Sequence, residues 1–106
     1  MLEEFVSAIH AKRQVQLAFF SKEDGTVISR RCAPMDYGPS RRAKLKQDRY
    51  HVWDYESDEK NHVLSLDPDK IVSLQVLDAT FDPAEFVSWD TSRSAWFVPR
   101  QWGEFS

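Results

Sequence analysis

The sequence predicts a mainly β, α+β fold, in which one helix precedes an antiparallel sheet of about five strands that curls into a small barrel or half-barrel. Three observations lead to this prediction: a helical apolar pattern at the start, short apolar stretches separated by polar turns, and an aromatic segment at the end. The 106 residues suit one domain, and 42% of them are hydrophobic, which is enough to build a core.

The helix is predicted over about residues 2–12, because apolar residues recur there at helical spacing. Acidic residues stand early in this stretch and basic residues late, as the helix dipole favours. The first two strands are VQLAFF and TVISRRCA, and Asp24-Gly25 between them suits a tight hairpin. Pro34 is expected to end pairing in the second strand, since proline has no N–H to donate.

The segment MDYGPSRRAKLKQD is predicted to be a loop, with a short helix over Arg41–Gln47 as the alternative. RYHVWDY, HVLSL and IVSLQVLD are the third, fourth and fifth strands. DPDK between the last two is a turn or a single helical turn, because proline suits the first position of such a turn.

The last part of the chain differs from a flexible tail, because it carries too many large apolar groups to leave in water. DPAEFVSW predicts a helical turn that begins at Asp82, and WFVP alternates like a sixth strand. The segment either folds back on its own sheet, docks into a second copy, or binds another protein. Its large aromatic residues are Phe81, Phe86, Trp89, Trp96, Phe97, Trp102 and Phe105.

Several stretches, taken in order, resemble one known family: IHAKRQVQLAF, a hairpin followed by VISRRCAP, RYHVWDY, and LSLDPDKIVSLQVLDATF. On these stretches residues 3–86 resemble the WYL domains of bacterial regulators, with Tyr50-His51-Val52 at the name-giving triplet. Ser65 and Lys70 stand nearest to positions where members carry arginines. The resemblance implies one Sm-like, SH3-type barrel over residues 1–106, with its core at 3–86 and an aromatic extension at 87–106.

The resemblance also implies a regulatory or sensor module that binds nucleic acid or another anionic ligand, often beside a helix-turn-helix DNA-binding domain. The charge pattern agrees with an anion-facing side, since residues 1–53 have a balance of +4 and residues 54–106 a balance of -7. Alternatively, the two halves partly neutralise one another in the fold.

A basic run precedes the third strand, and it is either a binding surface or a solvated loop. Arginine forks match phosphate oxygens, and aromatic rings stack on bases of single-stranded nucleic acid. Alternation in the third strand assigns Tyr50 and Val52 to the core and the odd residues to the opposite face. The residues expected to bind single-stranded nucleic acid or a nucleotide are Arg31, Arg41, Arg42, Lys44, Arg49, His51 and Trp53.

A second hypothesis makes the domain a protein-interaction or homodimerisation module that acts through its aromatic end. The basic run is then only a solubility device. The residues of that surface are Phe86, Trp89, Trp96, Phe97 and Trp102.

Catalysis, metal sites and cofactors are not expected from this sequence. Cys32 is the single cysteine, so an internal disulfide is excluded, and no histidine pair has structural-zinc spacing. The sequence has no long apolar run and no basic-then-apolar start, so a cytoplasmic protein that does not enter the membrane is predicted.

Overall fold

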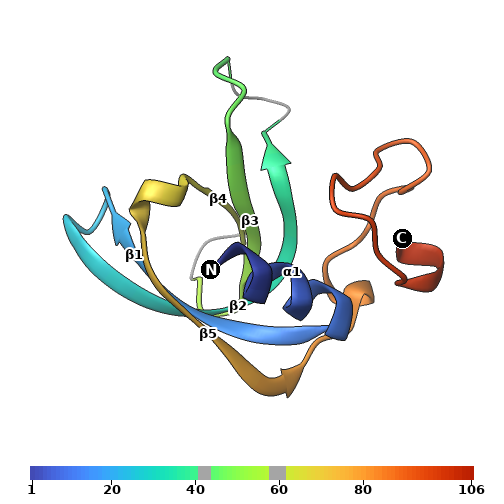
Figure 1. Ribbon diagram of the computed structural model, residues 1–106, viewed down its shortest axis with the longest axis horizontal. Coiled ribbons are helices and arrows are strands. Elements are labelled where there is room, and N and C mark those ends of the chain that lie inside the picture. The colour runs from blue at the N-terminus through green and yellow to red at the C-terminus, as the bar shows by residue number, and fades with distance from the viewer. Residues whose placement is uncertain (41–43, 58–61) are drawn as a thin grey trace.

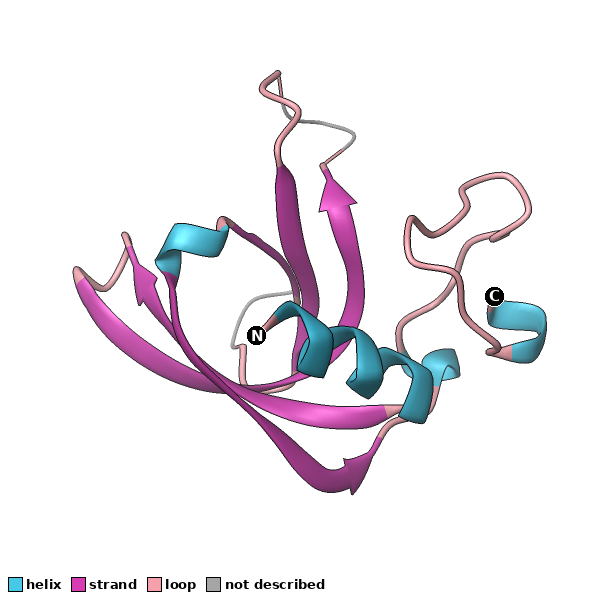
Figure 2. Ribbon diagram, in the orientation of Figure 1, coloured by secondary structure: helices cyan, strands magenta, loops and turns pink. Residues whose placement is uncertain are grey.

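The computed structural model describes residues 1–40, 44–57 and 62–106. One helix and five strands form its frame (Figures 1 and 2), and short 3-10 turns follow β4 and β5. The elements are α1 (Leu2–Ala11), β1 (Arg13–Ser21), β2 (Thr26–Pro39), β3 (Asp48–Asp54), β4 (Val63–Leu66), η1 (Pro68–Lys70), β5 (Ile71–Thr80), η2 (Pro83–Glu85) and η3 (Gly103–Phe105).

The five strands form one antiparallel sheet in the order β4-β3-β2-β1-β5. The sheet is strongly curved, and its β1–β5 half crosses its β3–β4 half in Figure 1. The predicted antiparallel sheet and N-terminal helix are confirmed. Among the described residues no pairing joins the edge strands β4 and β5, so the sheet is open and a closed barrel is not established.

Strand β2 is longer than predicted and joins the two halves of the sheet. Its first part pairs with β1 as far as Cys32, and its later part pairs with β3 as far as Pro39. The prediction that Pro34 ends pairing is therefore wrong. Pro34 lies beyond the β1 ladder and beside a register shift before Asp36, where a missing N–H is tolerated. The predicted loop thus begins after Pro39.

The helix α1 covers one face of the sheet with the apolar stripe that its sequence predicts. Phe5 and Ile9 are fully buried, and the Phe5 ring meets Tyr50 edge to face, with 4.9 Å between the centroids. Tyr50 and Val52 of β3 are buried as predicted from strand alternation. No helix in the described ranges is long and apolar enough to cross a lipid bilayer.

The C-terminal segment, residues 81–106, folds back on its own chain beside the β2–β3 half of the sheet (Figure 1). Its Trp102 indole N–H donates to the carbonyl oxygen of Ile9 at 2.9 Å, as a second donor beside the Lys12 backbone N–H at the end of α1. The predicted turn at Asp82 is confirmed as η2, with a capping box from Asp82 and Glu85. The predicted sixth strand is wrong, because no strand forms over residues 96–99.

Candidate ligand site

A cavity of about 520 Å³ lies between the β3–β4 half of the sheet and the C-terminal segment. This volume is within the usual range of small-molecule sites. The sheet side supplies Met35, Asp36, Pro39, Ser40, His51, Val63 and Ser65, and the C-terminal segment supplies Trp89, Ser94, Ala95, Trp96 and Phe97.

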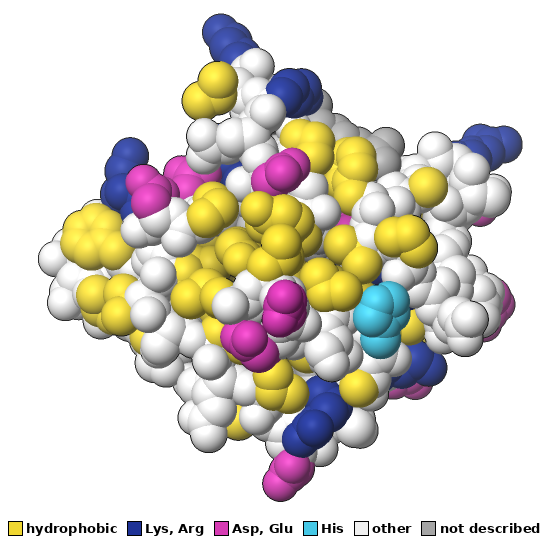
Figure 3. Space-filling model, viewed as in Figure 1, with side chains coloured by type: hydrophobic (Ala, Val, Ile, Leu, Met, Phe, Trp, Pro, Cys, Tyr) yellow, Lys and Arg dark blue, Asp and Glu magenta, His cyan; other side chains and the backbone are white. Residues whose placement is uncertain are grey.

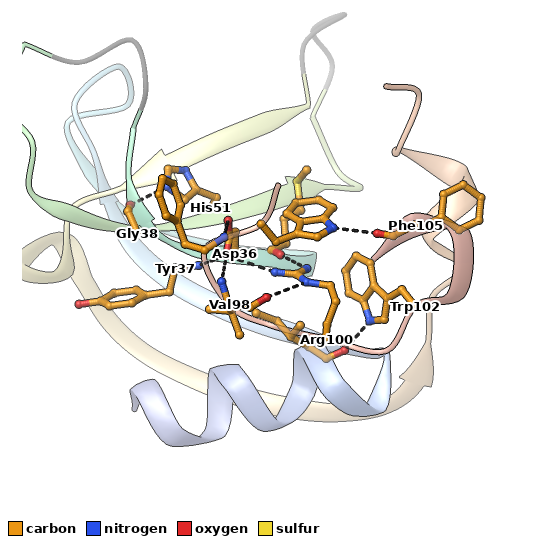
Figure 4. Close-up of polar contacts among 12 residues, drawn as sticks. Asp36, Tyr37, Gly38, His51, Val98, Arg100, Trp102 and Phe105 are labelled. Atoms are coloured by element: carbon orange, nitrogen blue, oxygen red, sulfur yellow. Dashed lines mark hydrogen bonds and ion pairs between the residues drawn. The ribbon is translucent and has the colours of Figure 1, made fainter. Parts of the chain in front are cut away.

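Strand register places three polar residues in one row on the floor of this cavity. Asp36 of β2 is paired with His51 of β3, and His51 is paired in turn with Ser65 of β4. The imidazole of His51 is held from both sides. Nδ1 lies 2.8 Å from the Ser65 hydroxyl. Nε2 lies 2.8 Å from the Gly38 carbonyl oxygen, as Figure 4 shows. The ring orientation is therefore fixed by the strands themselves.

The opposite wall is held in place by the carboxylate of Asp36. The backbone N–H groups of Phe97 and Val98 each donate to it at 2.9 Å. These two bonds replace the strand pairing that WFVP was predicted to make. The Phe97 ring packs so closely over Gly38 that a Cβ there would lie 2.5 Å from a ring carbon, so the close approach requires glycine.

Arg100 completes this anchor. Its guanidinium lies 3.2 Å from the Asp36 carboxylate and also donates to the Met35 carbonyl oxygen. Its Cζ stands 4.0 Å from the ring centroid of Trp96 and 4.4 Å from that of Trp102, a cation–π contact on each. Burial lowers the pKa of Arg100 to about 10, which leaves the guanidinium charged at neutral pH.

A second hollow that contains Lys46 adjoins the cavity, and its edge is called the Lys46 rim. This hollow of about 420 Å³ is lined by Pro39, Ser40, Lys46 and Phe97, and three of these residues also line the main cavity. The Lys46 ammonium donates to the Ser40 carbonyl oxygen at 3.1 Å, which holds it near the shared wall. Lys44 is exposed two residues earlier.

The structure separates the binding residues predicted from sequence. His51 lines the cavity, whereas Trp53 stacks between His62 and Phe86, with centroids 4.9 and 5.8 Å away. Arg41 and Arg42 lie outside the described residues. Figure 3 shows Lys and Arg side chains scattered around the edge of the face in view rather than gathered into one patch.

Two other predicted arginines have partners within the fold. Arg49 forms an ion pair of 2.7 Å with Asp67, and hydrogen bonds from Arg49 and Gln47 lower the pKa of Asp67. Arg31 donates to the Gln14 side chain at 2.6 Å and lies over the Tyr55 ring. Arg31 is eight residues along β2 from Pro39, on the order of 25 Å of extended strand.

The aromatic residues of the interaction hypothesis also divide into two groups. Phe86 and Trp102 are buried in the core, and Trp96 is half-buried against Arg100. Trp89 and Phe97 remain 39% and 46% exposed, and both line the cavity.

Sequence reasoning did not assign Asp36, Ser65 or Arg100 to a site. Strand alternation could have identified Ser65, because Ser65 of β4 is paired with His51 of β3 and lies on the same face of the sheet. Asp36 and Arg100 are 64 positions apart in the chain, so no local sequence pattern predicts that they form a pair.

The described residues offer little for catalysis or metal binding. Cys32 is fully buried, and burial raises the pKa of its thiol, so the nucleophilic thiolate is disfavoured. No group of three or more metal-ligating side chains occurs within residues 1–40, 44–57 and 62–106.

The fold is similar to part of a solved structure, that of proteasome accessory factor B/C (PafBC) of Arthrobacter aurescens. The two share 16% identity and a TM-score of 0.61 over 76% of this chain, and the match spans 12% of the PafBC chain. At this identity the likeness shows the fold alone, and it supports a WYL-like fold. No family model and no curated protein matches the sequence.

Proposed function

We propose that this domain is a non-catalytic regulatory module that senses an anionic ligand, either a nucleotide or single-stranded nucleic acid. The observation on which this rests is the cavity between the β3–β4 half of the sheet and the C-terminal segment, with Lys46 in the adjoining hollow. An aromatic-walled cavity beside a lysine combines a stacking surface with a phosphate partner. Of the residues predicted to bind, His51 lines this cavity. Lys46, which was not among them, lies in the adjoining hollow, and Lys44 is exposed two residues before it.

The likeness of fold to part of PafBC supports a regulatory role, as does the sequence resemblance to WYL domains. Because the overlap covers 12% of PafBC, the proposal concerns a sensor module and not the activity of that whole protein. Arg49 is set aside as the phosphate partner, because its guanidinium is bound to Asp67 at 2.7 Å.

The test is titration of labelled single-stranded DNA and RNA and of nucleoside monophosphates at two salt concentrations. Binding should weaken as salt rises, because phosphate contacts release counterions. A Lys44→Glu/Lys46→Glu variant should lose most of the binding. The single variants Lys46→Glu and Lys22→Glu form a matched pair with the same change of charge, because Lys22 is exposed at the β1–β2 turn.

The Arg41→Glu/Arg42→Glu variant separates the rest of the basic run from the cavity rim. Loss of binding in this variant alone places the phosphate partner on those arginines and retains an anion site. Salt-independent binding, or binding that survives every reversal, counts against the proposal.

A protein-interaction role has one specific observation in its favour, the exposure of Trp89 and Phe97. Truncation after Glu85 does not test it, because the truncation also removes the buried Phe86 and Trp102. The suitable variant is Trp89→Ser/Phe97→Ser, with molar mass measured by light scattering over a range of concentrations. A dimer that dissociates in this variant supports the interaction role, and a monomer at all concentrations argues against homodimerisation.

A further inference from the structure

The hydrogen bonds of His51 determine what the cavity floor offers to a ligand. The Gly38 carbonyl oxygen can only accept a hydrogen bond, so His51 Nε2 must carry a proton. In the neutral imidazole Nδ1 is then an acceptor, and the Ser65 hydroxyl, 2.8 Å away, donates its proton to it. The Ser65 oxygen keeps its lone pairs, and its exposed side chain presents them to the cavity as an acceptor.

Among the described residues that line the cavity, the carboxylate of Asp36 is already bound by other groups of the protein. Both oxygens of Asp36 accept hydrogen bonds: Oδ2 accepts the Phe97 N–H, and Oδ1 accepts the N–H groups of Tyr37 and Val98. Oδ1 also lies 3.2 Å from the Arg100 guanidinium, which compensates the negative charge. The described lining therefore suits an uncharged group, while a phosphate would be placed at the Lys46 rim.

The walls select for a flat group. Trp89 and Phe97 leave large parts of their rings in water although both border the cavity, and Trp96 lies beside them. The faces of aromatic side chains are surfaces on which bases stack. A planar ring in the cavity would thus cover apolar surface that the domain alone leaves exposed.

We infer that the cavity binds a heteroaromatic ring that carries an amino group, of the adenine type, and that Ser65 accepts a hydrogen bond from this amino group. The inference rests on the proposed function and deepens it. Ser65 determines specificity here, and His51 positions it by taking up the hydroxyl proton. The ring occupies the cavity, and a phosphate attached to it faces Lys46.

The experiment compares ligands that differ in one group. Adenosine 5′-monophosphate, purine riboside 5′-monophosphate, which lacks the amino group, and ribose 5-phosphate are titrated by calorimetry in a slightly alkaline buffer. One hydrogen bond of about 1 kcal/mol corresponds to a preference of about fivefold for the amino compound. Ribose 5-phosphate is expected to bind more weakly than both.

The Ser65→Ala variant should bind both purine nucleotides with equal affinity. Ser73→Ala is the matched control, an exposed serine on β5 that should keep the preference. Near-UV circular dichroism verifies that each variant is folded.

Equal affinity of the two purine nucleotides for the wild type overturns the inference, as does a preference that persists in Ser65→Ala. If ribose 5-phosphate binds as tightly as the nucleotides, the anion site stands and the ring is not in the cavity. If oligonucleotides bind with salt dependence but no mononucleotide does, the proposed function stands and this inference fails. If no anion binds, both fail.

Discussion

The guanidinium of Arg100 lies 3.2 Å from the carboxylate of Asp36, although 64 residues separate the two in the chain. The Arg100 side chain is fully buried, and that of Asp36 is 10% exposed. The pair fastens the C-terminal segment to β2 and so holds one wall of the cavity against the other. The buried ion pair therefore contributes to the shape of the candidate site, because Asp36 also lines the cavity.

Removing one member of this pair should destabilise the domain strongly. Asp36→Ala leaves the Arg100 charge buried without its counter-ion, and such changes cost about 3–5 kcal/mol. Urea denaturation measures the free energy of unfolding. The double variant Asp36→Asn/Arg100→Met should lose less than the sum of the single variants Asp36→Asn and Arg100→Met, because it leaves no uncompensated charge. Additive losses would show that the pair is not energetically coupled.

Trp102 and Trp89 should differ sharply in their contribution to stability. Trp102 is 3% exposed and donates to the Ile9 carbonyl oxygen, so Trp102→Ala should cost about 3–5 kcal/mol. Trp89 is 39% exposed, so Trp89→Ala should cost about 1 kcal/mol. Thermal denaturation of the two variants gives the comparison. Equal losses would contradict the packing described for the C-terminal segment.

Gly38→Ala should displace the Phe97 ring from the cavity wall. A Cβ at this position would lie 2.5–2.9 Å from three Phe97 side-chain atoms. Overpacking of this kind costs about 1–3 kcal/mol. The double variant Gly38→Ala/Phe97→Ala should recover part of the loss, because the clash is removed. Unfolding in urea measures both, and a double variant less stable than either single variant would argue against the contact.

The pKa of Asp67 should lie below its ordinary value, chiefly because the Arg49 side chain donates a hydrogen bond to it. A depressed folded-state pKa contributes stability above the unfolded-state value, and this contribution is lost as pH falls through the folded-state pKa. Arg49→Met should raise the pKa of Asp67 and flatten the loss of stability on the acid side. Carboxyl NMR titration measures the shift, and Arg13→Met, whose partner is Asp78, is the control.

Local patterns in the sequence predicted α1 and the positions of the five strands, but not the full length of β2, and strand alternation predicted the two faces of β3. Helical spacing predicted α1, and alternation placed Tyr50 and Val52 in the core and His51 on the opposite face. The prediction for Pro34 was wrong because a missing N–H ends pairing only where a neighbouring strand needs it as a donor. Which strand lies there is decided by the assembled sheet.

The candidate site could not be predicted from the sequence, because it is formed by contacts between residues that lie far apart in the chain. The polar row Asp36, His51 and Ser65 comes from three strands, and its register includes a shift next to Pro34. WFVP alternates like a strand, yet the Asp36 carboxylate, far away in sequence, takes up its N–H groups. Arg49 was predicted to bind a ligand, but its carboxylate partner stands 18 residues later, after β4.

The indole of Trp102 closes a bond to Ile9 across 93 residues of chain. Contacts this distant in sequence form late, since the chain between them must first be ordered. Because the Lys12 backbone N–H also donates to the Ile9 carbonyl oxygen, at 3.3 Å, the end of α1 can form before the C-terminal segment docks, and the Trp102 bond is then added to it.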